Sequence, residues 1–224
     1  MKSKVLFITG ASSGIGAETA RHAVKCGWKV ALFARSQDKL AALAKEIGSD
    51  ALVVPGDVTD LAVLQDAIRK TVQEFGAVDA VFANAGTGLD TPGIENGDPD
   101  EWRKLIDINI MGVMLTIKAA YAELKKATGH LVLTGSVAGR VHIPASIYGA
   151  SKWFVHGLAG NMAPDMREWG GRCTVIAPGM VDTPFFEEAK PDKLKPADIA
   201  KAVLYALDQP SHANVQEIVV MPTG

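Results

Sequence analysis

Cysteine is scarce in this sequence. The 224 residues include only two cysteines, Cys26 and Cys173, which lie far apart and form no CxxC pair. So small a number excludes a disulfide framework, and the spacing is wrong for a zinc site, so we expect no bound metal. We therefore expect both cysteines to be buried free thiols of a protein in a reducing cytosol.

Long apolar runs are also missing. No stretch approaches the roughly 18 uninterrupted apolar residues that a membrane span needs. The segment Met1–Lys4 resembles the charged start of a signal peptide, but Thr9 and Gly10 end the apolar run Val5–Ile8 too early. We expect this run to form the first strand of a cytoplasmic protein that does not contact a membrane.

Neither sign of charge is in excess. Lys and Arg total 23 and Asp and Glu total 25, which gives a net charge of −2. Because there is no large basic surface, the chain as a whole is not drawn to nucleic acid or to anionic lipid. A small molecule is the expected partner.

The composition itself is that of an ordinary globular protein. Apolar residues make up 48% of the chain and charged residues 21%, which excludes disorder, collagen and coiled coil. At this length we expect residues 1–224 to form a single domain, because two full domains would be cramped.

Short apolar runs rich in Val, Ile and Leu alternate with segments of helical spacing. The runs lack polar alternation, which is typical of strands buried on both faces of a parallel sheet. They are Val5–Thr9, Val30–Ala34, Ala51–Val54, Val78–Asn84, His130–Gly135, Cys173–Ala177 and Ile218–Met221. The helical segments are Ile15–Val24, Gln37–Ile47, Leu61–Phe75, Glu101–Lys126, Gly149–Trp169 and Ala197–Leu207. The alternation predicts an α/β fold: a doubly wound parallel sheet (Rossmann) of about seven strands, flanked by helices on both faces.

One irregular patch interrupts this alternation. The segment from 185 to 195 is dense in Glu, Lys and Pro and lies between the sixth predicted strand and the last helix. A surface linker is one interpretation. A loop that leaves the carboxyl end of a strand in such a sheet borders the ligand crevice, however, so we favour a small mobile lid over the substrate.

A glycine-rich turn follows the first strand directly and runs into a helix. Glycines permit positive φ and close backbone approach, so exposed amides and the helix N-terminus can hold a pyrophosphate. A plain reversal of the chain is the alternative, but strand, turn and helix are all in place. The GxxxGxG spacing, without a following lysine, fits neither a P-loop nor the GxGxxG fingerprint. The candidate cofactor contacts are Gly10, Ser12, Ser13, Gly14, Ile15 and Gly16.

The second strand runs into Arg35, roughly 20 residues past the glycines, where an acidic residue would bind the ribose of NAD. A guanidinium instead matches a 2′-phosphate, and Ser12 and Ser13 add hydroxyl donors. The alternative is that Arg35 is a solvated side chain at the end of a surface strand and binds no ligand. The missing carboxylate together with the added cation favours NADP (NADPH) as the cofactor.

Two further polar segments follow strands at the same expected edge of the sheet. Asp57 and Val58 come after the third strand, and Asn84, Ala85 and Gly86 come after the fourth. Taken singly, they are explained as a helix cap and a turn. At the carboxyl ends of parallel strands they also suit contact with an adenine amine and with the nicotinamide half of a cofactor.

Tyr148 and Lys152 lie four residues apart, which on a helix puts the phenol and the ammonium on one face. A nearby cation stabilises phenolate, so we expect it to lower the pKa of Tyr148 from about 10 toward neutral pH, where the phenol becomes a usable acid. Such a pair also occurs by chance on solvated helices. Ser136, at the end of the fifth strand, adds a hydroxyl that can hold a substrate carbonyl beside the phenol.

Asn109 is a polar residue inside the apolar helical run Leu105–Ile110. Asn is mildly unfavourable in a helix interior. It is either a buried amide whose hydrogen bonds are satisfied or a water-holding kink in a proton relay.

Taken together, these motifs resemble the short-chain dehydrogenase/reductase family. The resemblance rests on TGASSGIG at 9–16, DV at 57–58, NAG at 84–86, Asn109, Ser136, YxxxK at 148–152 and PGMVDTP at 178–184, in order along nearly the whole chain. It implies a catalytic tetrad: Tyr148 as general acid/base, Lys152 tuning it and binding the nicotinamide ribose, Ser136 orienting the carbonyl, and Asn109 anchoring a water relay. It also implies that Tyr148 and Lys152 contact the cofactor, and that the nicotinamide is lined by Pro178, Gly179, Val181 and Thr183.

The sequence departs from the family pattern at three positions. Ala83 stands where an Asn is frequent, Gly135 where many members have a Ser, and Gly149 in place of the Ser of YSASK. None of these changes removes an atom of the tetrad. The C-terminal end is similar to the branch of NADP-dependent reductases that act on small 3-hydroxy acids, serine or semialdehydes.

We expect the substrate pocket to draw on Thr87–Leu89, Val137–Ile143 and Met180–Phe186. Arg140 and His142 either meet a substrate carboxylate or are solvated. Phe185 and Phe186 either cap an apolar substrate or anchor the lid.

The resemblance implies an NADP(H)-dependent oxidoreductase that moves a hydride between nicotinamide and the carbonyl or alcohol carbon of a small ketone, aldehyde or 3-hydroxy acid. Two alternatives stay open, an NADP-sensing module without catalysis and an epimerase or dehydratase of nucleotide sugars. The intact tetrad disfavours the first, and the short chain disfavours the second. The resemblance also implies a homo-oligomer, a tetramer or a dimer, formed through the helices that carry Asn109 and Tyr148.

Overall fold

The computed structural model describes residues 3–91, 93–186 and 188–224. Within these residues, seven parallel strands form one sheet in the order β3-β2-β1-β4-β5-β6-β7. The strands are β1 (Val5–Thr9), β2 (Lys29–Ala34), β3 (Ala51–Pro55), β4 (Ala80–Ala83), β5 (His130–Thr134), β6 (Arg172–Pro178) and β7 (Glu217–Val220). The strand order reverses between β1 and β4, and in such sheets ligands bind outside the carboxyl ends at this point. The predicted doubly wound sheet is confirmed, although β4 is shorter than the predicted strand Val78–Asn84.

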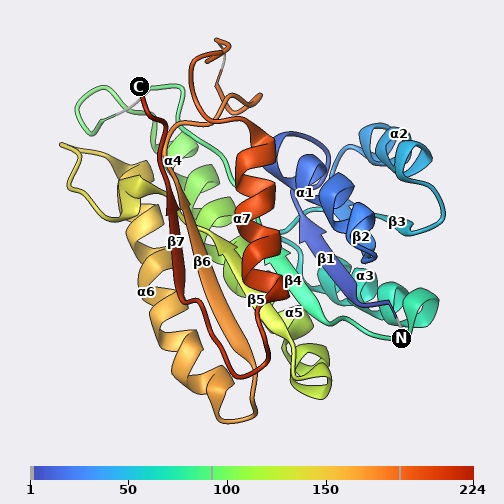
Figure 1. Cartoon of the computed structure of the whole chain (residues 1–224). Coiled ribbons are helices and arrows are strands. Elements are labelled where there is room, and N and C mark those ends of the chain that lie inside the picture. The colour runs from blue at the N-terminus through green and yellow to red at the C-terminus, as the bar shows by residue number, and fades with distance from the viewer. Residues whose placement is uncertain (1–2, 92, 187) are drawn as a thin grey trace.

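Helices cover both faces of the sheet (Figure 1). They are α1 (Gly14–Lys25), α2 (Gln37–Ile47), α3 (Leu61–Phe75), α4 (Pro99–Ile106), α5 (Gly112–Ala127), α6 (Ile147–Arg167) and α7 (Pro196–Asp208). Helices α1, α2 and α7 pack on one face, and α3, α5 and α6 pack on the other. The chain is therefore a single three-layer domain, with both faces of the sheet buried.

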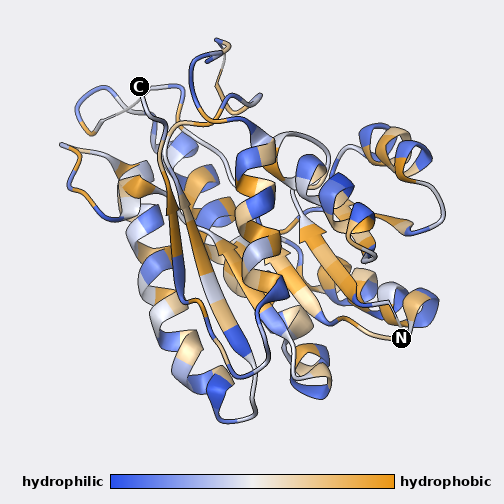
Figure 2. Cartoon of the chain, viewed as in Figure 1, coloured by the Kyte–Doolittle hydropathy of each residue, from blue (hydrophilic) through white to orange (hydrophobic). Residues whose placement is uncertain are grey.

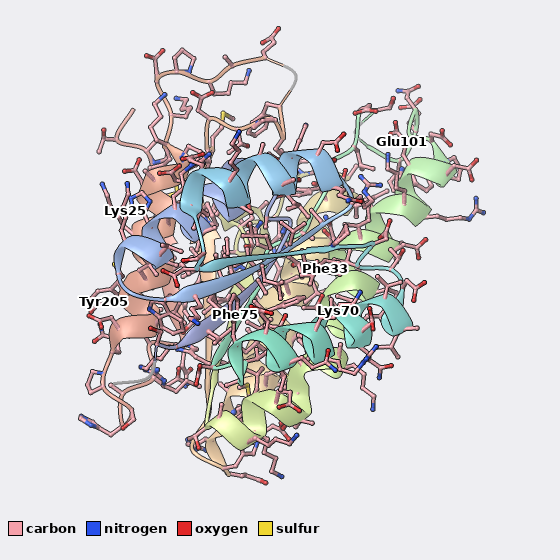
Figure 3. The ribbon with its side chains drawn as sticks, turned by 90° about the vertical axis from the view of Figure 1, so that its right-hand side faces the viewer. Lys25, Phe33, Lys70, Phe75, Glu101 and Tyr205 are labelled. Carbon is pink, nitrogen blue, oxygen red and sulfur yellow. The ribbon has the colours of Figure 1, made fainter. Side chains whose placement is uncertain are left out.

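The core consists of two apolar layers, one on each face of the sheet. Because side chains alternate along a strand, Phe7 of β1 joins the layer under α3 and α5, while its neighbours Leu6 and Ile8 join the layer under α1 and α7. The strands are mainly hydrophobic, whereas the helices are hydrophilic on their outer sides (Figure 2). Phe33 accordingly lies inside the molecule, while Lys25 and Tyr205 lie at its edge (Figure 3).

The predicted helix Glu101–Lys126 consists of α4, a π-helical turn at Asp107–Met111 and α5. Asp98 caps its start by accepting a hydrogen bond from the backbone N–H of Asp100, and Pro99 occupies the first turn. The stretch Pro99–Ala127 is long and apolar enough to cross a membrane by length and composition alone. In this fold α5 contacts α3, β4 and β5, so the core of the domain accounts for its apolar character.

The two cysteines differ in their surroundings. Cys173 on β6 is buried, and burial raises the pKa of its thiol to about 12. Cys26 is exposed, so the prediction of two buried thiols is wrong for this residue. Its position explains the difference, because it directly follows the last residue of α1 and precedes the turn at Gly27.

A buried histidine begins β5. His130 is 2% exposed, and its Nε2 lies 2.7 Å from the hydroxyl oxygen of Thr174. Burial, together with the nearby charges of Arg172 and Lys4, lowers the pKa of His130 from 6.5 to about 3. The folded protein therefore keeps this ring neutral at pH values where an unfolded chain protonates it.

We predict that His130 makes folding stability depend on pH. Between about pH 6.5 and pH 3 the unfolded state binds a proton that the folded state does not, so the free energy of unfolding falls as pH is lowered, by up to about 1.4 kcal/mol per pH unit. Urea unfolding across this range should give a smaller slope for His130→Gln than for the wild type. Replacing the exposed His212 by Gln should leave the slope unchanged. Equal slopes for His130→Gln and wild type would contradict the prediction.

Candidate active site

A cleft of about 390 Å³ opens at the carboxyl edge of the sheet, with walls from the loops after β1, β2, β3, β4, β5 and β6. It gathers most of the predicted site residues: Gly10, Ser12, Ser13, Gly14, Ile15, Arg35, Asp57, Val58, Asn84, Ala85, Gly86, Ser136, Tyr148, Lys152, Pro178, Gly179, Val181 and Thr183. Two predicted residues, Gly16 and Asn109, lie outside its lining.

The glycines of the turn after β1 are needed for different reasons. Gly10 has a φ of 67°, and a Cβ at this position would lie 2.9 Å from the Cα of Ala85. A Cβ at Gly16 would lie only 2.3 Å from the carbonyl oxygen of Gly10. Gly10 thus lets the loops after β1 and β4 meet, and Gly16 lets α1 start directly against the turn.

Helix α1 begins at the floor of the cleft without a cap of its own. Ser13 is the N-cap residue, but its side chain makes no capping hydrogen bond, and the first turn holds no acidic residue. The first amides of a helix have no partner within the helix and carry a partial positive charge. Together with Gly10 and Gly14, which also line the cleft, they fit the pyrophosphate of a dinucleotide.

Arg35 lies exposed at the rim of the cleft, directly after β2. None of the ion pairs within the described residues involves it, so its guanidinium is not committed to a carboxylate of the same chain. Ser12 and Ser13 line the same cleft, as predicted.

Asp57 lines the cleft and also stabilises a turn of the backbone. Its Oδ1 accepts hydrogen bonds from the backbone N–H of Thr59 at 3.0 Å and from the Thr59 hydroxyl at 2.9 Å. These bonds hold the turn between β3 and α3. Of the two interpretations, the turn is therefore present in the structure, and contact with adenine stays a prediction.

Asn84 ties the loop after β4 to both neighbouring strands. Its Nδ2 donates to the carbonyl oxygen of Thr9 at 3.1 Å, and its Oδ1 accepts from the Thr134 hydroxyl at 3.1 Å. The backbone N–H groups of Asn84 and Ala85 both donate to the hydroxyl of Thr9. The carboxyl ends of β1, β4 and β5 are thereby fixed to one another, which places the glycine turn beside the end of β5.

Ser136 follows β5 and begins a 3₁₀ turn, Val137–Gly139. Its hydroxyl oxygen accepts a hydrogen bond from the backbone N–H of Ala138 at 3.1 Å, and the hydroxyl lies near enough to the Tyr148 phenol to lower the pKa of that phenol. Ser146 caps the start of α6 through the N–H of Gly149, which sets the first turn of the helix that carries Tyr148. The serine and the phenol are thus neighbours in the cleft, as predicted.

Lys152 is buried, 6% exposed, on the same helix face as Tyr148. Its ammonium donates to the carbonyl oxygen of Thr134 at 2.9 Å and lies 5.7 Å from the centre of the Tyr148 ring. Burial lowers the pKa of Lys152 to about 8. The expected lowering of the Tyr148 pKa is not found, because burial of the phenol raises that pKa and outweighs the nearby Ser136 hydroxyl, which lowers it.

Asn109 is a buried amide whose side-chain oxygen and nitrogen both form hydrogen bonds. Its Oδ1 accepts from the N–H of Thr87 at 2.8 Å, and its Nδ2 donates to the carbonyl oxygen of Thr87 at 2.9 Å and to the Ser151 hydroxyl at 3.3 Å. It lies in the π-helical turn, so the helix is irregular there as the kink interpretation expects. Asn109 joins the loop after β4 to α6, and its part in a proton relay stays a prediction.

One segment of the expected substrate pocket, Val137–Ile143, lies outside the cleft. Arg140 forms an ion pair with Glu217, and the ring of His142 stacks on Trp153 at 5.2 Å between centroids. Neither residue lines the cleft, nor does the rest of Val137–Ile143. The prediction that this segment helps form the pocket is therefore wrong, because Arg140 pairs with Glu217 on β7 and His142 stacks on Trp153 of α6 instead.

The predicted lid, 185–195, forms a loop above the carboxyl edge of the sheet (Figure 1). A bridge between Val181 and Leu194 and an ion pair between Asp182 and Lys195 close its base. Phe185 and Phe186 line the cleft, and the Phe185 ring lies 5.7 Å from that of Tyr148. Glu187 lies outside the described residues, and closure of the loop over a substrate stays a prediction.

Some residues that line the cleft are not predicted from the sequence. Lys104 and Ile108 reach the cleft from the helical stretch before Asn109, and their spacing of four residues on one helix face was a usable signal. The other unpredicted lining residues are close neighbours of predicted ones: Ala34, Ser36, Gly56, Thr134 and Gly135.

Comparison with known proteins gives consistent matches over the whole chain. The family model described as short chain dehydrogenase matches residues 4–194. An uncharacterized oxidoreductase of Staphylococcus aureus (strain MRSA252) is 40% identical over 228 residues, covering 99% of this chain and 98% of the relative. The alcohol dehydrogenase of the archaeon Thermococcus sibiricus, complexed with 5-hydroxy-NADP, superimposes with a TM-score of 0.90 at 31% identity, covering 99% of this chain and 97% of that one. The 3-ketoacyl-(acyl-carrier-protein) reductase of Brucella melitensis, complexed with NADH, also gives a TM-score of 0.90, at 27% identity over 98% of this chain and 97% of that one.

We predict that Asn109→Ala destabilises the protein. The substitution leaves the half-buried backbone groups of Thr87 and the buried Ser151 hydroxyl without this partner, which should lower the free energy of unfolding by about 1–3 kcal/mol. Urea unfolding measures the loss. The exposed Asn96 provides the matched control, and Asn96→Ala should change stability by less than about 0.5 kcal/mol. Equal, small effects of the two substitutions would contradict this assignment.

Proposed function

The chain belongs to the short chain dehydrogenase family, and on this premise we propose that it is an NADP(H)-dependent oxidoreductase acting on a small carbonyl or alcohol compound. One observation carries the proposal. A single cleft brings together the uncapped N-terminus of α1, the guanidinium of Arg35, and the neighbouring side chains of Ser136, Tyr148 and Lys152. The first two features suit a phosphorylated dinucleotide, and the last three suit proton transfer to a carbonyl oxygen.

Arg35 is the basis for proposing NADP(H). A 2′-phosphate on the ribose needs a cation where NAD needs a carboxylate, and Arg35 follows β2 at that place. The two solved neighbours described above hold 5-hydroxy-NADP and NADH, respectively, so the cofactor choice for this chain depends on its own residues. The glycine turn with the first amides of α1 would hold the pyrophosphate, and Pro178, Gly179, Val181 and Thr183 would lie along the nicotinamide.

The cofactor, when bound, supplies or accepts a hydride at the carbon of the substrate carbonyl or alcohol. In the direction of reduction, Tyr148 donates its phenolic proton to the carbonyl oxygen. Because burial raises the pKa of Tyr148, the phenol stays protonated at neutral pH and is ready to act as the acid.

The other members of the tetrad hold the reacting groups. The Ser136 hydroxyl, next to the phenol, is proposed to bind the carbonyl oxygen and orient it toward Tyr148. Lys152 places a cation near the Tyr148 ring, where it stabilises the phenolate that remains after the proton has left. Asn109 joins the loop after β4 to α6 and so holds these two walls of the cleft in position relative to each other.

The helices that carry the tetrad also present apolar side chains to solvent. Met111 is 40% exposed and Trp153 on α6 is 42% exposed. Exposed apolar residues on adjacent helices are typical of contact surfaces. We propose that these helices form the contact of a homo-oligomer, a tetramer or a dimer.

Arg35→Asp should shift the cofactor preference from NADPH toward NADH. The substitution removes a charge-assisted pairing with the 2′-phosphate and adds a repelling carboxylate, so the Kd for NADPH should rise roughly tenfold or more, while NADH binds as well as before or better. Titration calorimetry with both cofactors measures this. Arg69→Asp, the same change on α3 outside the cleft lining, should alter neither Kd. Equal affinity of the wild type for NADPH and NADH would contradict the assignment of Arg35.

Tyr148→Phe should abolish turnover and spare cofactor binding. It removes the proton donor and keeps the ring, so kcat for carbonyl reduction should fall about 100-fold to 10,000-fold while the Kd for NADPH changes little. Nicotinamide absorbance with a panel of ketones, aldehydes and hydroxy acids measures turnover. Tyr205→Phe, on the exposed face of α7, should be fully active. If the wild type binds NADPH and turns over none of the compounds, a cofactor-sensing module becomes the better account.

A further inference from the structure

A histidine contacts the turn that carries Ser136 from outside the cleft. His156 lies one helical turn after Lys152 on α6, and its side chain is 12% exposed. Its Nε2 lies 3.0 Å from the carbonyl oxygen of Ser136 and 3.4 Å from the backbone nitrogen of the same residue. His156 does not line the cleft, so it contacts the backbone of the serine and cannot meet a substrate there.

Charged residues from two other segments hold the opposite side of this ring. The Nδ1 of His156 lies 3.2 Å from Oε1 of Glu217, at the start of β7. The second carboxylate oxygen of Glu217 pairs with the guanidinium of Arg140, which follows the 3₁₀ turn begun by Ser136. The ring is thereby fixed between the β5–α6 loop and the last strand of the sheet.

The ring of His156 packs closely against the backbone on both sides of Ser136, where two glycines stand. A Cβ at Gly135 would lie 2.6 Å from the Nε2 of His156, and a Cβ at Gly139 would lie 2.7 Å from its Cδ2. Neither glycine has a positive φ, so it is close approach and not backbone conformation that requires them. The residues on both sides of Ser136 therefore leave room for this imidazole.

Whether Nε2 of His156 carries a proton decides which backbone group of Ser136 it binds. In the neutral ring with its proton on Nδ1, facing Glu217, Nε2 accepts from the Ser136 N–H. In the imidazolium, and in the neutral ring with its proton on Nε2, Nε2 donates to the Ser136 carbonyl oxygen instead. Burial, Arg140 and Lys152 lower the pKa of His156, whereas Glu217 and the Ser136 carbonyl oxygen raise it.

We propose that His156, held by Glu217 and Arg140, is a positioning residue that fixes the backbone of Ser136 and through it the direction of the serine hydroxyl. The effect on reaction rate rests on the proposed function, which assigns that hydroxyl to the substrate carbonyl. The contact between His156 and the Ser136 backbone does not depend on that function.

A double-mutant cycle tests whether His156 acts through Ser136. His156→Leu removes both ring nitrogens, and we expect it to lower kcat roughly tenfold when Ser136 is present but less than about twofold in the Ser136→Ala background. His156→Gln, whose amide both donates and accepts, should recover most of the loss. His22 on α1, which also pairs with a glutamate, is the matched control, and His22→Leu should leave kcat unchanged. If His156→Leu does not fold, Glu217→Gln replaces it, with a smaller loss that again disappears in the Ser136→Ala background.

An NMR titration tests the contact without any turnover. In the wild type, the amide resonance of Ser136 should shift with the same midpoint as the ring of His156, below pH 6.5. In His156→Gln this shift should vanish, and in Glu217→Gln the midpoint should move to lower pH, because the carboxylate that favours the imidazolium is gone.

The outcomes separate the two proposals. Equal losses of kcat with and without the Ser136 hydroxyl, or a Ser136 amide that does not follow the His156 midpoint, would overturn the positioning role. Absence of turnover by the wild-type protein would overturn the proposed function alone, and the titration would then still decide whether His156 sets the Ser136 backbone.

Discussion

The hydrogen bonds of Asn84 are the constraint on which the rest of the site depends. This side chain joins the carboxyl ends of β1 and β5 to β4, across the point where the strand order reverses. Thr134, which donates to Asn84, also offers its carbonyl oxygen to Lys152. One continuous set of hydrogen bonds therefore connects the glycine turn, proposed to hold phosphate, with the ammonium beside Tyr148. The proposed cofactor half and the proposed catalytic half of the cleft are thus fixed to each other by the protein alone.

Burial determines the pKa shifts of Lys152 and Tyr148, the groups proposed for catalysis. Lys152 is desolvated, which lowers its pKa to about 8, and the phenol of Tyr148 is desolvated as well, which raises its pKa. A carbonyl oxygen and a ring face are the partners that the structure provides for this buried cation. By contrast the loop that bears Phe185 is held mainly at its base, by the ion pair between Asp182 and Lys195. The hydrogen-bonded strand ends thus hold the groups proposed for chemistry, and the loop that bears Phe185 borders the cleft.

The sequence predicts the sheet and most of the cleft, because unbroken apolar runs followed by Gly, Asn or Ser fix both the strands and what lies at their ends. Prediction from the sequence fails where a contact between residues far apart in the chain determines the position of a side chain. The pairing of Arg140 with Glu217 turns Arg140 away from the cleft, and nothing local in the sequence predicts a partner 77 residues away. Gly135 is visible in the sequence only as a departure from the family pattern. Its reason, room for the ring of His156, appears once α6 is packed against β5.

The most direct test of this account follows the transferred hydrogen. The protein would be incubated with NADPH deuterated at the transferable C4 position and with a carbonyl substrate, and the product would be analysed by mass spectrometry. The account predicts one deuterium on the former carbonyl carbon of the product, formed by the wild type and lost with Tyr148→Phe. A product without deuterium, or one formed at the same rate by both proteins, would contradict hydride transfer assisted by Tyr148.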